Sequence, residues 1–589
     1  MEYFWLLLFI VFLAGILFLY SKKGIKYSIG FTYIVSIIVS ARLFYEYQGT
    51  ASILNCLVFS AQMFTFGVNG KELVEIIYEI SSKISYFYII CVWAVYLVSP
   101  ALTVSAVLSF IKKGLDRLTL KMIFKKDIYI ISEKNENSLL LASDIIKTKK
   151  NSVVIFAGTD SEDISSHKIC VNKSESEILK LLNKNNSVHI CFNDTDSGIL
   201  LDKVKNFLQE GIAKKVKIYV FSDNEIVFEV VDGINKTLEN LYIKIISVNA
   251  ILMKSILWDY PLYKNMNKND ELNVSVFGVG EFGGYFAKNT LWCGVLPSCR
   301  LKLNLIDRDN YEEIIGRVSD NIPKEFFDIE VFSENIHASD LNEKLEKTRV
   351  VNSDYILVAM GNDDLNIKVS RKLRLYFSRN GRNPFILTVL KNQSKFTVMK
   401  DVLECEGIEV TGGVNNIYGY KYIFEDRFFN KAYKTYDFIC KNYNEVATVD
   451  GFYKQSQIDI LSSYASAIHN KYKVFALTGK ENPTAREINS KLVENHSSLV
   501  EAEHQRWVNF EVLKGYIGVP QDKLYDFLIN NNTSRKRHRN DELKIHACIT
   551  DVDGVKKLDN MLYEHFGKKP NLIKNDKDII DNLYYLYGE

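Results

Sequence analysis

The first hundred residues carry long runs of apolar side chains with few charges between them. Three of these runs, Tyr3 to Tyr20, Tyr27 to Phe44 and Ile84 to Ile111, are long enough to cross a bilayer, whose hydrocarbon core needs about 20 helical residues. The second run holds a single charge, Arg42, close to its end, where a long side chain can reach the membrane interface. We therefore predict an α-helical transmembrane domain over residues 1–111.

A fourth apolar segment, Ala51 to Gly67, lies between the second and third runs. It is shorter and contains Asn, Ser, Gln and Thr, so it either forms a fourth span or enters the membrane only as a re-entrant or interfacial helix. Basic residues flank the spans at Lys22 to Lys26 and at 112–126, and a re-entrant helix places both groups on one side, as the positive-inside rule prefers. We favour three spans plus a re-entrant helix. Either count makes the chain a multi-pass protein of the inner (plasma) membrane and places everything after residue 112 in the cytoplasm.

The end of this short segment, Thr65-Phe66-Gly67, resembles a potassium-channel pore loop, whose filter is a Thr-x-Gly-aromatic-Gly strand of carbonyl groups. The pattern departs from the filter at Val68, which replaces the aromatic residue, and an extra residue precedes the second glycine, Gly70. The other interpretation is a glycine-turned extracellular loop. We favour the loop and keep a pore at Thr65, Phe66 and Gly67 as an alternative.

From residue 127 the pattern changes to short runs of β-branched and aromatic residues that alternate with amphipathic stretches. Such alternation indicates βαβ units and a parallel sheet. The runs form two series, and we predict two successive Rossmann-like, doubly wound α/β units over residues 112–265 and 266–415. The runs are 127–132, 152–157, 167–171, 187–192, 216–221 and 241–246 in the first series, and 273–278, 301–307, 329–333, 354–361 and 384–390 in the second.

The second unit contains a glycine motif, Gly278, Gly280 and Gly283, between its first strand and a helical stretch. In this context G-x-G-x-x-G has a mechanism, because the glycines permit a tight turn and close approach of a phosphate to the N–H groups of the helix N-terminus. The next strand ends at Asp307, where an acidic residue usually accepts the ribose hydroxyls. A nucleotide site is therefore predicted there. The competing interpretation is a tight strand–helix turn in a domain that binds nothing.

Two further loops at the ends of strands complete this picture. Gly361 and Asn362 follow a later strand of the second unit, at the sheet edge where ligands of open α/β folds bind, although an ordinary turn with a helix cap would look the same. In the first unit, the loop at 132–137 has no glycine and two acidic residues, which disfavours a pyrophosphate. We predict a structural or dimerising role for that unit. Together the two units resemble the nucleotide-binding domains of potassium-uptake regulatory (TrkA-type) proteins.

After a helical connector (416–494), residues 501–507 read Glu-Ala-Glu-His-Gln-Arg-Trp, followed by Gly515-Tyr516 and by Lys-Ile-His-Ala-Cys-Ile at 544–549. These motifs resemble the prokaryotic ryanodine-receptor-repeat (RyR) domain over about 495–589, a family known to be fused behind TrkA-type units and membrane helices. The resemblance implies a ligand-sensing module, in which Tyr516 stands where a tryptophan is often found. The alternative is that its aromatic and His side chains are core residues. The candidate ligand-binding residues are His504, Arg506, Trp507, Tyr516, Lys544 and His546.

Composition narrows the function classes. The net charge of +2 gives no reason to expect a nucleic-acid partner. Nine scattered cysteines form no C-x-x-C pair and no Cys/His cluster with zinc spacing, so we predict reduced thiols and no metal. The sequence holds neither a nucleophile–base pair nor a P-loop, so we predict that the protein is not an enzyme.

Taken together, these features predict a nucleotide-gated transmembrane effector that works as a homo-oligomer in the lipid bilayer. A small nucleotide, either NAD-like or a cyclic or oligo-adenylate second messenger, binds the Rossmann or RyR region and opens or permeabilises the membrane. The family resemblance implies a setting in bacterial antiviral defence, of the CRISPR type III or cyclic-oligonucleotide kind. One alternative is a potassium channel or transport regulator that responds to NAD(H) or another adenine nucleotide. A second alternative is a membrane-anchored NAD-dependent enzyme.

Overall fold

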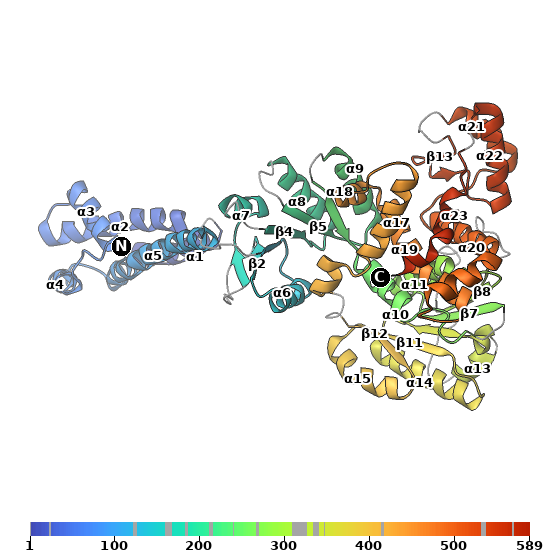
Figure 1. Cartoon of the computed structure of the whole chain (residues 1–589). Helices are drawn as coiled ribbons and strands as arrows, with labels where there is room; N and C mark the ends of the chain where they lie inside the picture. Colours follow the sequence, from blue (N-terminus) through green and yellow to red (C-terminus); the bar gives the residue numbers. More distant parts are fainter. Residues whose placement is uncertain are drawn as a thin grey trace. The chain divides into compact units, whose positions relative to one another are not determined.

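The fold is known from a computed structural model of the whole chain (Figure 1). It describes residues 2–22, 25–121, 127–158, 168–182, 187–210, 216–238, 241–266, 270–308, 327–333, 341–346, 348–413, 418–531, 537–567 and 570–588. Lys23 and residues 122–126 of the predicted basic clusters lie outside these ranges. The chain divides into an N-terminal unit that ends at Phe124 and a larger unit after it.

The N-terminal unit consists of helices, drawn in blue in Figure 1. Three of them, α1, α2 and α5, are long and apolar enough to cross a membrane, which confirms the three predicted spans. The short apolar segment forms α3, whose 12 residues are too few for the roughly 20 that a span needs. The helices are α1 (Glu2–Lys22), α2 (Ile25–Gln48), α3 (Ile53–Phe64), α4 (Gly70–Ile80) and α5 (Tyr86–Lys121).

Helix α4 was not predicted. It begins at Asn69, whose side chain accepts the N–H of Lys71, and it buries one apolar face that includes Leu73 and Ile77. The long helices pack through backbone contacts as well as side chains, since the hydroxyl of Tyr88 donates to the carbonyl of Val39 at 2.7 Å. Outward-facing apolar residues are common on this unit, as expected of helices that meet lipid.

The larger unit contains two six-stranded parallel sheets. The first has the strand order β3-β2-β1-β4-β5-β6, and its strands coincide with the six predicted runs. Its strands are β1 (Asp127–Ile131), β2 (Ser152–Ala157), β3 (Lys168–Val171), β4 (Ser187–Phe192), β5 (Val216–Phe221) and β6 (Ile243–Ile246). Its helices are α6 (Glu136–Thr148), α7 (Glu175–Leu181), α8 (Ser197–Gln209), α9 (Glu225–Thr237) and α10 (Val248–Asp259).

The second sheet repeats this topology with the order β12-β11-β10-β7-β8-β9, so both sheets are doubly wound as predicted. The strand order reverses between β1 and β4 in one sheet and between β7 and β10 in the other, which is where ligands of such folds bind. Strand β12 was not predicted. The strands are β7 (Glu271–Phe277), β8 (Arg300–Asp307), β9 (Phe327–Ser333), β10 (Tyr355–Val358), β11 (Phe385–Leu390) and β12 (Glu409–Gly412). The helices are α11 (Glu281–Cys293), α13 (Leu341–Glu346), α14 (Asp363–Arg379) and α15 (Gln393–Cys405), with the 3₁₀ turn η1 (Arg349–Asn352).

The C-terminal region is mainly helical, as predicted, and its longest helix runs through the predicted domain boundary at residue 494. Its elements are η2 (Lys421–Glu425), α17 (Phe429–Asn442), α18 (Val449–Lys454), α19 (Gln457–Thr478), α20 (Ala485–Leu513), η3 (Gln521–Lys523), α21 (Leu524–Asn530), β13 (Arg539–Asn540), β14 (Ile545–His546), α22 (Val552–Phe566), α23 (Lys574–Asp581) and α24 (Leu583–Tyr587). The short strands β13 and β14 pair antiparallel.

Helices α19 and α20 pack directly against the second Rossmann unit. The side-chain amide of Asn509 donates to the carbonyl of Leu291 at 2.7 Å, and the hydroxyl of Tyr472 donates to the carbonyl of Leu257 at 2.9 Å. The segment around η2 returns to the first sheet, where Phe424 packs on the edges of the Tyr129, His189 and Tyr219 rings. The connector therefore joins both sheets and the C-terminal helices into one packed unit.

Candidate nucleotide-binding site

The turn after β7 needs two of its three glycines for steric reasons. Gly278 has a φ of +85°, and a Cβ there would lie 2.5 Å from the Cα of Met360. A Cβ at Gly283 would lie 1.8 Å from the carbonyl oxygen of Gly278, which no side chain tolerates. Gly280 is different, because a Cβ at that position would meet nothing within 4 Å. The strand thus turns tightly into α11, and open space remains at Gly280.

The N-terminus of α11 lacks the side-chain cap that its neighbours have. Helices α6, α8, α9, α10, α14 and α15 all begin with an Asn, Asp or Ser side chain that accepts a first-turn N–H. Helix α11 begins at Gly280, which offers no such acceptor. The unfilled N–H groups and the positive end of the helix dipole therefore remain available to an anion.

A cavity of about 130 Å³ opens at this helix end, and we call it the glycine-loop cavity. It is lined by residues of the loop, of the ends of β8 and β10, and of the turn after β11. Those residues are Gly278, Gly280, Glu281, Phe282, Asp307, Ala359, Met360, Gly361, Asp363, Asn366, Val389 and Lys391. The structure thus places four of the six predicted nucleotide-binding residues, Gly278, Gly280, Asp307 and Gly361, on one cavity at the point where the strand order reverses.

Asp307 supports the glycine loop from the end of β8. Its Oδ2 accepts the N–H of Val279 at 2.5 Å and its Oδ1 accepts the N–H of Arg308 at 2.6 Å. The carboxylate therefore fixes the loop in place while it lines the cavity. A carboxylate in this position is an acceptor for hydroxyl groups of a sugar rather than for a phosphate.

The side chain of Asn362 serves as the cap of α14, because its Oδ1 accepts the N–H of Leu365 at 3.0 Å. The neighbouring Asp363 accepts the N–H groups of Lys391 and Asn392 at 3.0 and 2.9 Å. Asn362 thus matches the interpretation as an ordinary helix cap, whereas Gly361, with a φ of +78°, lines the cavity.

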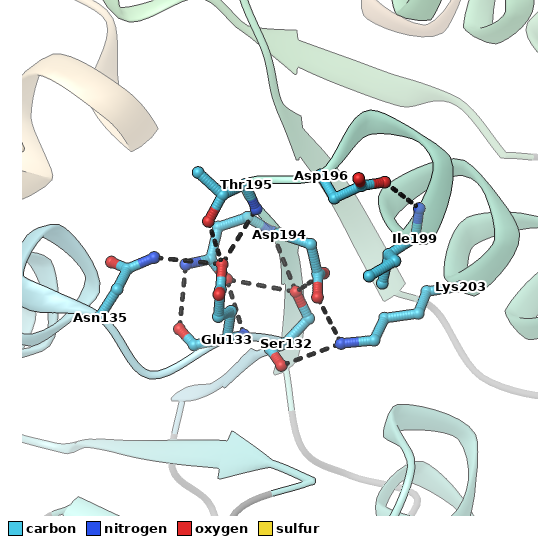
Figure 2. Close-up of polar contacts among 9 residues, drawn as sticks. Ser132, Glu133, Asn135, Asp194, Thr195, Asp196, Ile199 and Lys203 are labelled. Carbon is cyan, nitrogen blue, oxygen red and sulfur yellow. Dashed lines mark hydrogen bonds and ion pairs between the residues drawn. The ribbon is translucent and has the colours of Figure 1, made fainter.

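The first Rossmann unit differs at the equivalent place (Figure 2). The carboxylate of Glu133 accepts the N–H and the hydroxyl of Thr195 at 3.0 and 2.9 Å, which ties the loop after β1 to the loop after β4. Asp194 accepts the hydroxyl of Ser132 and the ammonium of Lys203, both at 2.5 Å. Asn135 caps α6 in a capping box. The unit's own side chains therefore fill the contacts that a pyrophosphate needs, as its acidic loop predicted.

A cavity of about 310 Å³ lies beside this network, lined mainly by amides and hydroxyls together with Asp194 and Asp223. Its lining includes no Lys or Arg. Burial raises the pKa of Asp223, which accepts the hydroxyl of Ser247. The polarity of this cavity suits a neutral polar molecule better than a phosphate.

In the C-terminal region, His504 is buried with both ring nitrogens engaged. Nδ1 lies 2.9 Å from a carboxylate oxygen of Asp576, and Nε2 lies 2.9 Å from the carbonyl of Thr550. Both partners are acceptors, so the ring donates twice as an imidazolium. Burial alone would lower the pKa of His504, but these hydrogen bonds outweigh it and the pKa is raised.

Arg506 is buried in an ion network of α19 and α20. Its Nε donates to Glu503 at 3.1 Å, and Lys473 donates to the same carboxylate at 2.6 Å. Burial favours the neutral form of Glu503, but the two cations hold the pKa of that carboxyl well below its usual range. Arg506 therefore balances a buried charge and holds the two helices together.

The remaining C-terminal candidates fall into separate groups. Trp507 is half-buried between the rings of His504 and His546, at centroid distances of 5.7 and 5.0 Å. Tyr516 donates its hydroxyl to Asp541 at 2.8 Å, and the ammonium of Lys544 lies 3.7 Å from Glu229 of α9. Only His504, Trp507 and His546 thus come together, and none of the six candidates lines the two cavities described above.

His546 belongs to a second cluster that the sequence spacing did not reveal. One ligand atom each of His538, His546 and Cys548 lies within 4.8 Å of the others, which is close enough for a shared metal ion. Nδ1 of His546 accepts the N–H of Cys548 at 3.1 Å. The signal in the sequence was the pair His546 and Cys548, but His538 comes from the other side of the β-hairpin, so no local motif showed the cluster.

The alternative pore residues lie in the turn between α3 and α4. The hydroxyl of Thr65 donates to the carbonyl groups of Ala61 and Gln62 at 3.3 Å each, and the N–H of Gly67 donates to Gln62 at 2.8 Å. Phe66 has a φ of +58°. The three residues close the C-terminal end of α3, and Asn69 then starts α4.

No family model matches the chain, and no curated protein matches it. Solved structures resemble it at low similarity. GsuK bound to ADP is 15% identical with a TM-score of 0.32, covering 66% of this chain and 95% of its own. The GsuK channel bound to NAD is 12% identical with a TM-score of 0.34, covering 68% and 83%, and a dipicolinate synthase chain from Bacillus halodurans is 11% identical with a TM-score of 0.20, covering 51% and 94%. At these values the geometry of the site rests on the present structure alone.

Proposed function

We propose that this protein is a membrane protein regulated by an adenine nucleotide, and that the glycine-loop cavity is its nucleotide site. The N-terminal helices give it a place in the bilayer, and binding in the cytoplasmic Rossmann unit changes ion or solute passage through them. This is the function of a channel or transport regulator, with an NAD-type or ADP-type ligand. A ligand can shift such an equilibrium only as far as it binds one state better than the other.

The observation that carries the proposal is the uncapped N-terminus of α11. Among the seven Rossmann helices compared above, it alone begins with a glycine that leaves its N–H groups unfilled, and it does so at the edge of a cavity. A phosphate at this position accepts the N–H groups and meets the helix dipole. Asp307, on the opposite side of the loop, is placed to accept hydroxyls of a ribose.

The proposal treats the site as regulatory rather than catalytic. The glycine-loop cavity is lined by carboxylates and one lysine, but by no His, Cys or Ser that would act as a nucleophile or proton carrier on a bound nucleotide. A preparation that binds NADH without oxidising it in the presence of candidate acceptors supports this view. Stoichiometric turnover of the bound dinucleotide would instead favour a membrane-anchored enzyme.

The direct test is a binding panel on the purified full chain in detergent. Isothermal titration with ADP, NAD⁺, NADH and a cyclic oligoadenylate should give a saturable signal for at least one adenine nucleotide and none for adenosine at the same concentration. A preference for the nucleotide over the nucleoside follows from the phosphate contact. Equal binding of adenosine and ADP would exclude a phosphate at α11.

A second candidate is an antiviral effector that responds to a nucleotide second messenger through the C-terminal region. It is favoured by the RyR-like motifs and by the assembly of His504, Trp507 and His546 around one ring cluster. In this case Trp507→Ala, rather than a change at Gly280, should remove the response to a cyclic oligonucleotide. Survival of bacteria challenged with phage, with and without the Trp507→Ala chain, tests the biological setting.

A further inference from the structure

Four helices from three parts of the larger unit enclose a second kind of cavity, which we call the junction cavity. Helix α10 follows the first sheet, α11 belongs to the second, and α19 and α20 come from the C-terminal region. Its walls include Lys254, Tyr285, Trp292, Ala465, Phe510 and Lys514. The cavity is therefore built only when both Rossmann units and the C-terminal helices are packed together.

The junction cavity has room for a small molecule with an apolar body. Its volume is about 100 Å³, against about 150 Å³ for an apolar protein cavity that binds benzene. Trp292, Ala465 and Phe510 on its walls are all at least 95% buried, so the inner part of the cavity is poorly hydrated. Apolar walls of this kind favour a compact ring or a branched chain.

Three lysines reach this cavity from three helices. Lys254 lies 3.8 Å from Asp426 and 3.9 Å from the centre of the Tyr464 ring, so it is partly neutralised. Lys288 and Lys514 have no ion pair with any residue that the structure describes. Glu225 is the one acidic residue of the lining. The cavity therefore carries an excess of positive charge.

Lys514 shows the cost of this arrangement. It is half-buried at the end of α20, and burial lowers the pKa of its ammonium group. A lysine in such a place is usually paired, because an ammonium loses hydration there without compensation. An anion in the mouth of the cavity would supply the missing partner.

We propose that the junction cavity binds a small organic anion, with its apolar or aromatic body against Trp292 and Phe510 and its carboxylate or phosphate between Lys288 and Lys514. This site is separate from the glycine-loop cavity and does not depend on the proposed nucleotide. The two sites share α11, since Gly280 lies at its N-terminus and Trp292 lies near its other end. A ligand in the junction cavity contacts all four helices, so it stabilises their packing in proportion to its occupancy.

The test uses benzoate and phenyl phosphate as probes, with benzyl alcohol as the uncharged counterpart, on the full chain in detergent. Isothermal titration should show saturable binding of both anions and at least tenfold weaker binding of benzyl alcohol. Lys514→Met should weaken the anions at least tenfold and raise the unfolding temperature in their absence, because the unpaired ammonium is gone. Lys288→Gln, at an exposed position, should weaken them without changing the unfolding temperature.

Two controls locate the binding. Lys523→Met removes an exposed lysine that does not line the cavity, and it should leave anion binding unchanged. Gly280→Asp, which blocks the glycine loop, should also leave it unchanged, while Lys514→Met should leave nucleotide binding intact. Absence of anion binding at millimolar concentration, or anion binding that Gly280→Asp abolishes and Lys514→Met spares, would overturn the proposal. Neither result bears on the nucleotide site itself.

Discussion

Replacing Gly280 by aspartate separates stability from binding at the glycine loop. Gly280 is the cap of α11, with φ −63° and ψ −164°, an extended conformation that any residue adopts, and a Cβ there meets nothing within 4 Å. The new carboxylate can accept a first-turn N–H of α11 in the way that Asp196 does at α8. The substitution therefore fits the fold and fills the position that we assign to the ligand phosphate.

The two effects have opposite signs and different sizes. Asp in place of Gly at a helix cap is worth a few tenths of a kcal/mol, and the lost flexibility of glycine in the unfolded chain adds about 0.4 to 1 kcal/mol. The unfolding free energy should thus rise by up to about 1 kcal/mol. A carboxylate about 4 Å from a phosphate costs about 4 kcal/mol at an effective dielectric constant of 20. That cost corresponds to roughly a thousandfold loss of nucleotide affinity.

Thermal unfolding and isothermal titration of the full chain in detergent measure both quantities. The matched control is Gly233→Asp on the exposed side of α9, where a Cβ also meets nothing within 4 Å, so the same charge is added far from the loop. We expect Gly280→Asp to unfold at the same or a higher temperature with ADP or NAD binding lost, and Gly233→Asp to bind like the wild type. Nucleotide affinity within threefold of the wild type in Gly280→Asp would refute a phosphate at α11.

Three further predictions concern packing and buried charge. Gly283→Ala should lower the unfolding temperature and abolish nucleotide binding, because its Cβ would lie 1.8 Å from the Gly278 carbonyl and the loop must move; an unchanged unfolding temperature would contradict this. Burial raises the pKa of Glu511 from 4.5 to about 7, so the stability that its proton supplies is complete below pH 4.5 and is lost as the pH rises through 7. Glu511→Gln should therefore flatten the dependence of unfolding temperature on pH between 5 and 8 by the equivalent of up to roughly 3 kcal/mol, and a profile parallel to the wild type would count against the buried carboxyl. Lys473→Met leaves the buried carboxylate of Glu503 with one cation fewer and should lower the unfolding free energy in urea by about 3 kcal/mol or more, whereas Lys523→Met on the surface should change it by less than about 0.5 kcal/mol.

The strands of both sheets could be predicted because each is a short buried run of β-branched and aromatic residues, such as Val153 to Ala157. Strand β12 was missed because it has only four residues, Glu409–Gly412, two of which are Glu and Gly. Helix α4 was missed because it has 11 residues, begins with glycine and buries only one face. Local pattern is weakest where an element is short and depends on its neighbours.

The glycine loop was predictable for a similar reason, since its strand, glycines, helix and Asp307 are contiguous or nearly so. The C-terminal residues were harder. Arg506 looks like a surface or ligand-binding arginine in the sequence, but it is buried because Glu503 and Lys473 neutralise each other and it. Lys473 comes from a different helix, so no window around Arg506 shows the network. The junction cavity was equally hidden, because four separate helices build it.

The most direct test of the central claim is ion flux through the reconstituted protein. The full chain in liposomes loaded with potassium should change its rate of potassium release when ADP or NAD⁺ is present on the side that carries the larger unit, and Gly280→Asp should abolish that response while retaining the basal rate. The account predicts that the nucleotide concentration at half-maximal response equals the Kd from titration. A protein that binds nucleotide at Gly280 yet releases potassium and larger solutes at the same rate with and without it would contradict the claim.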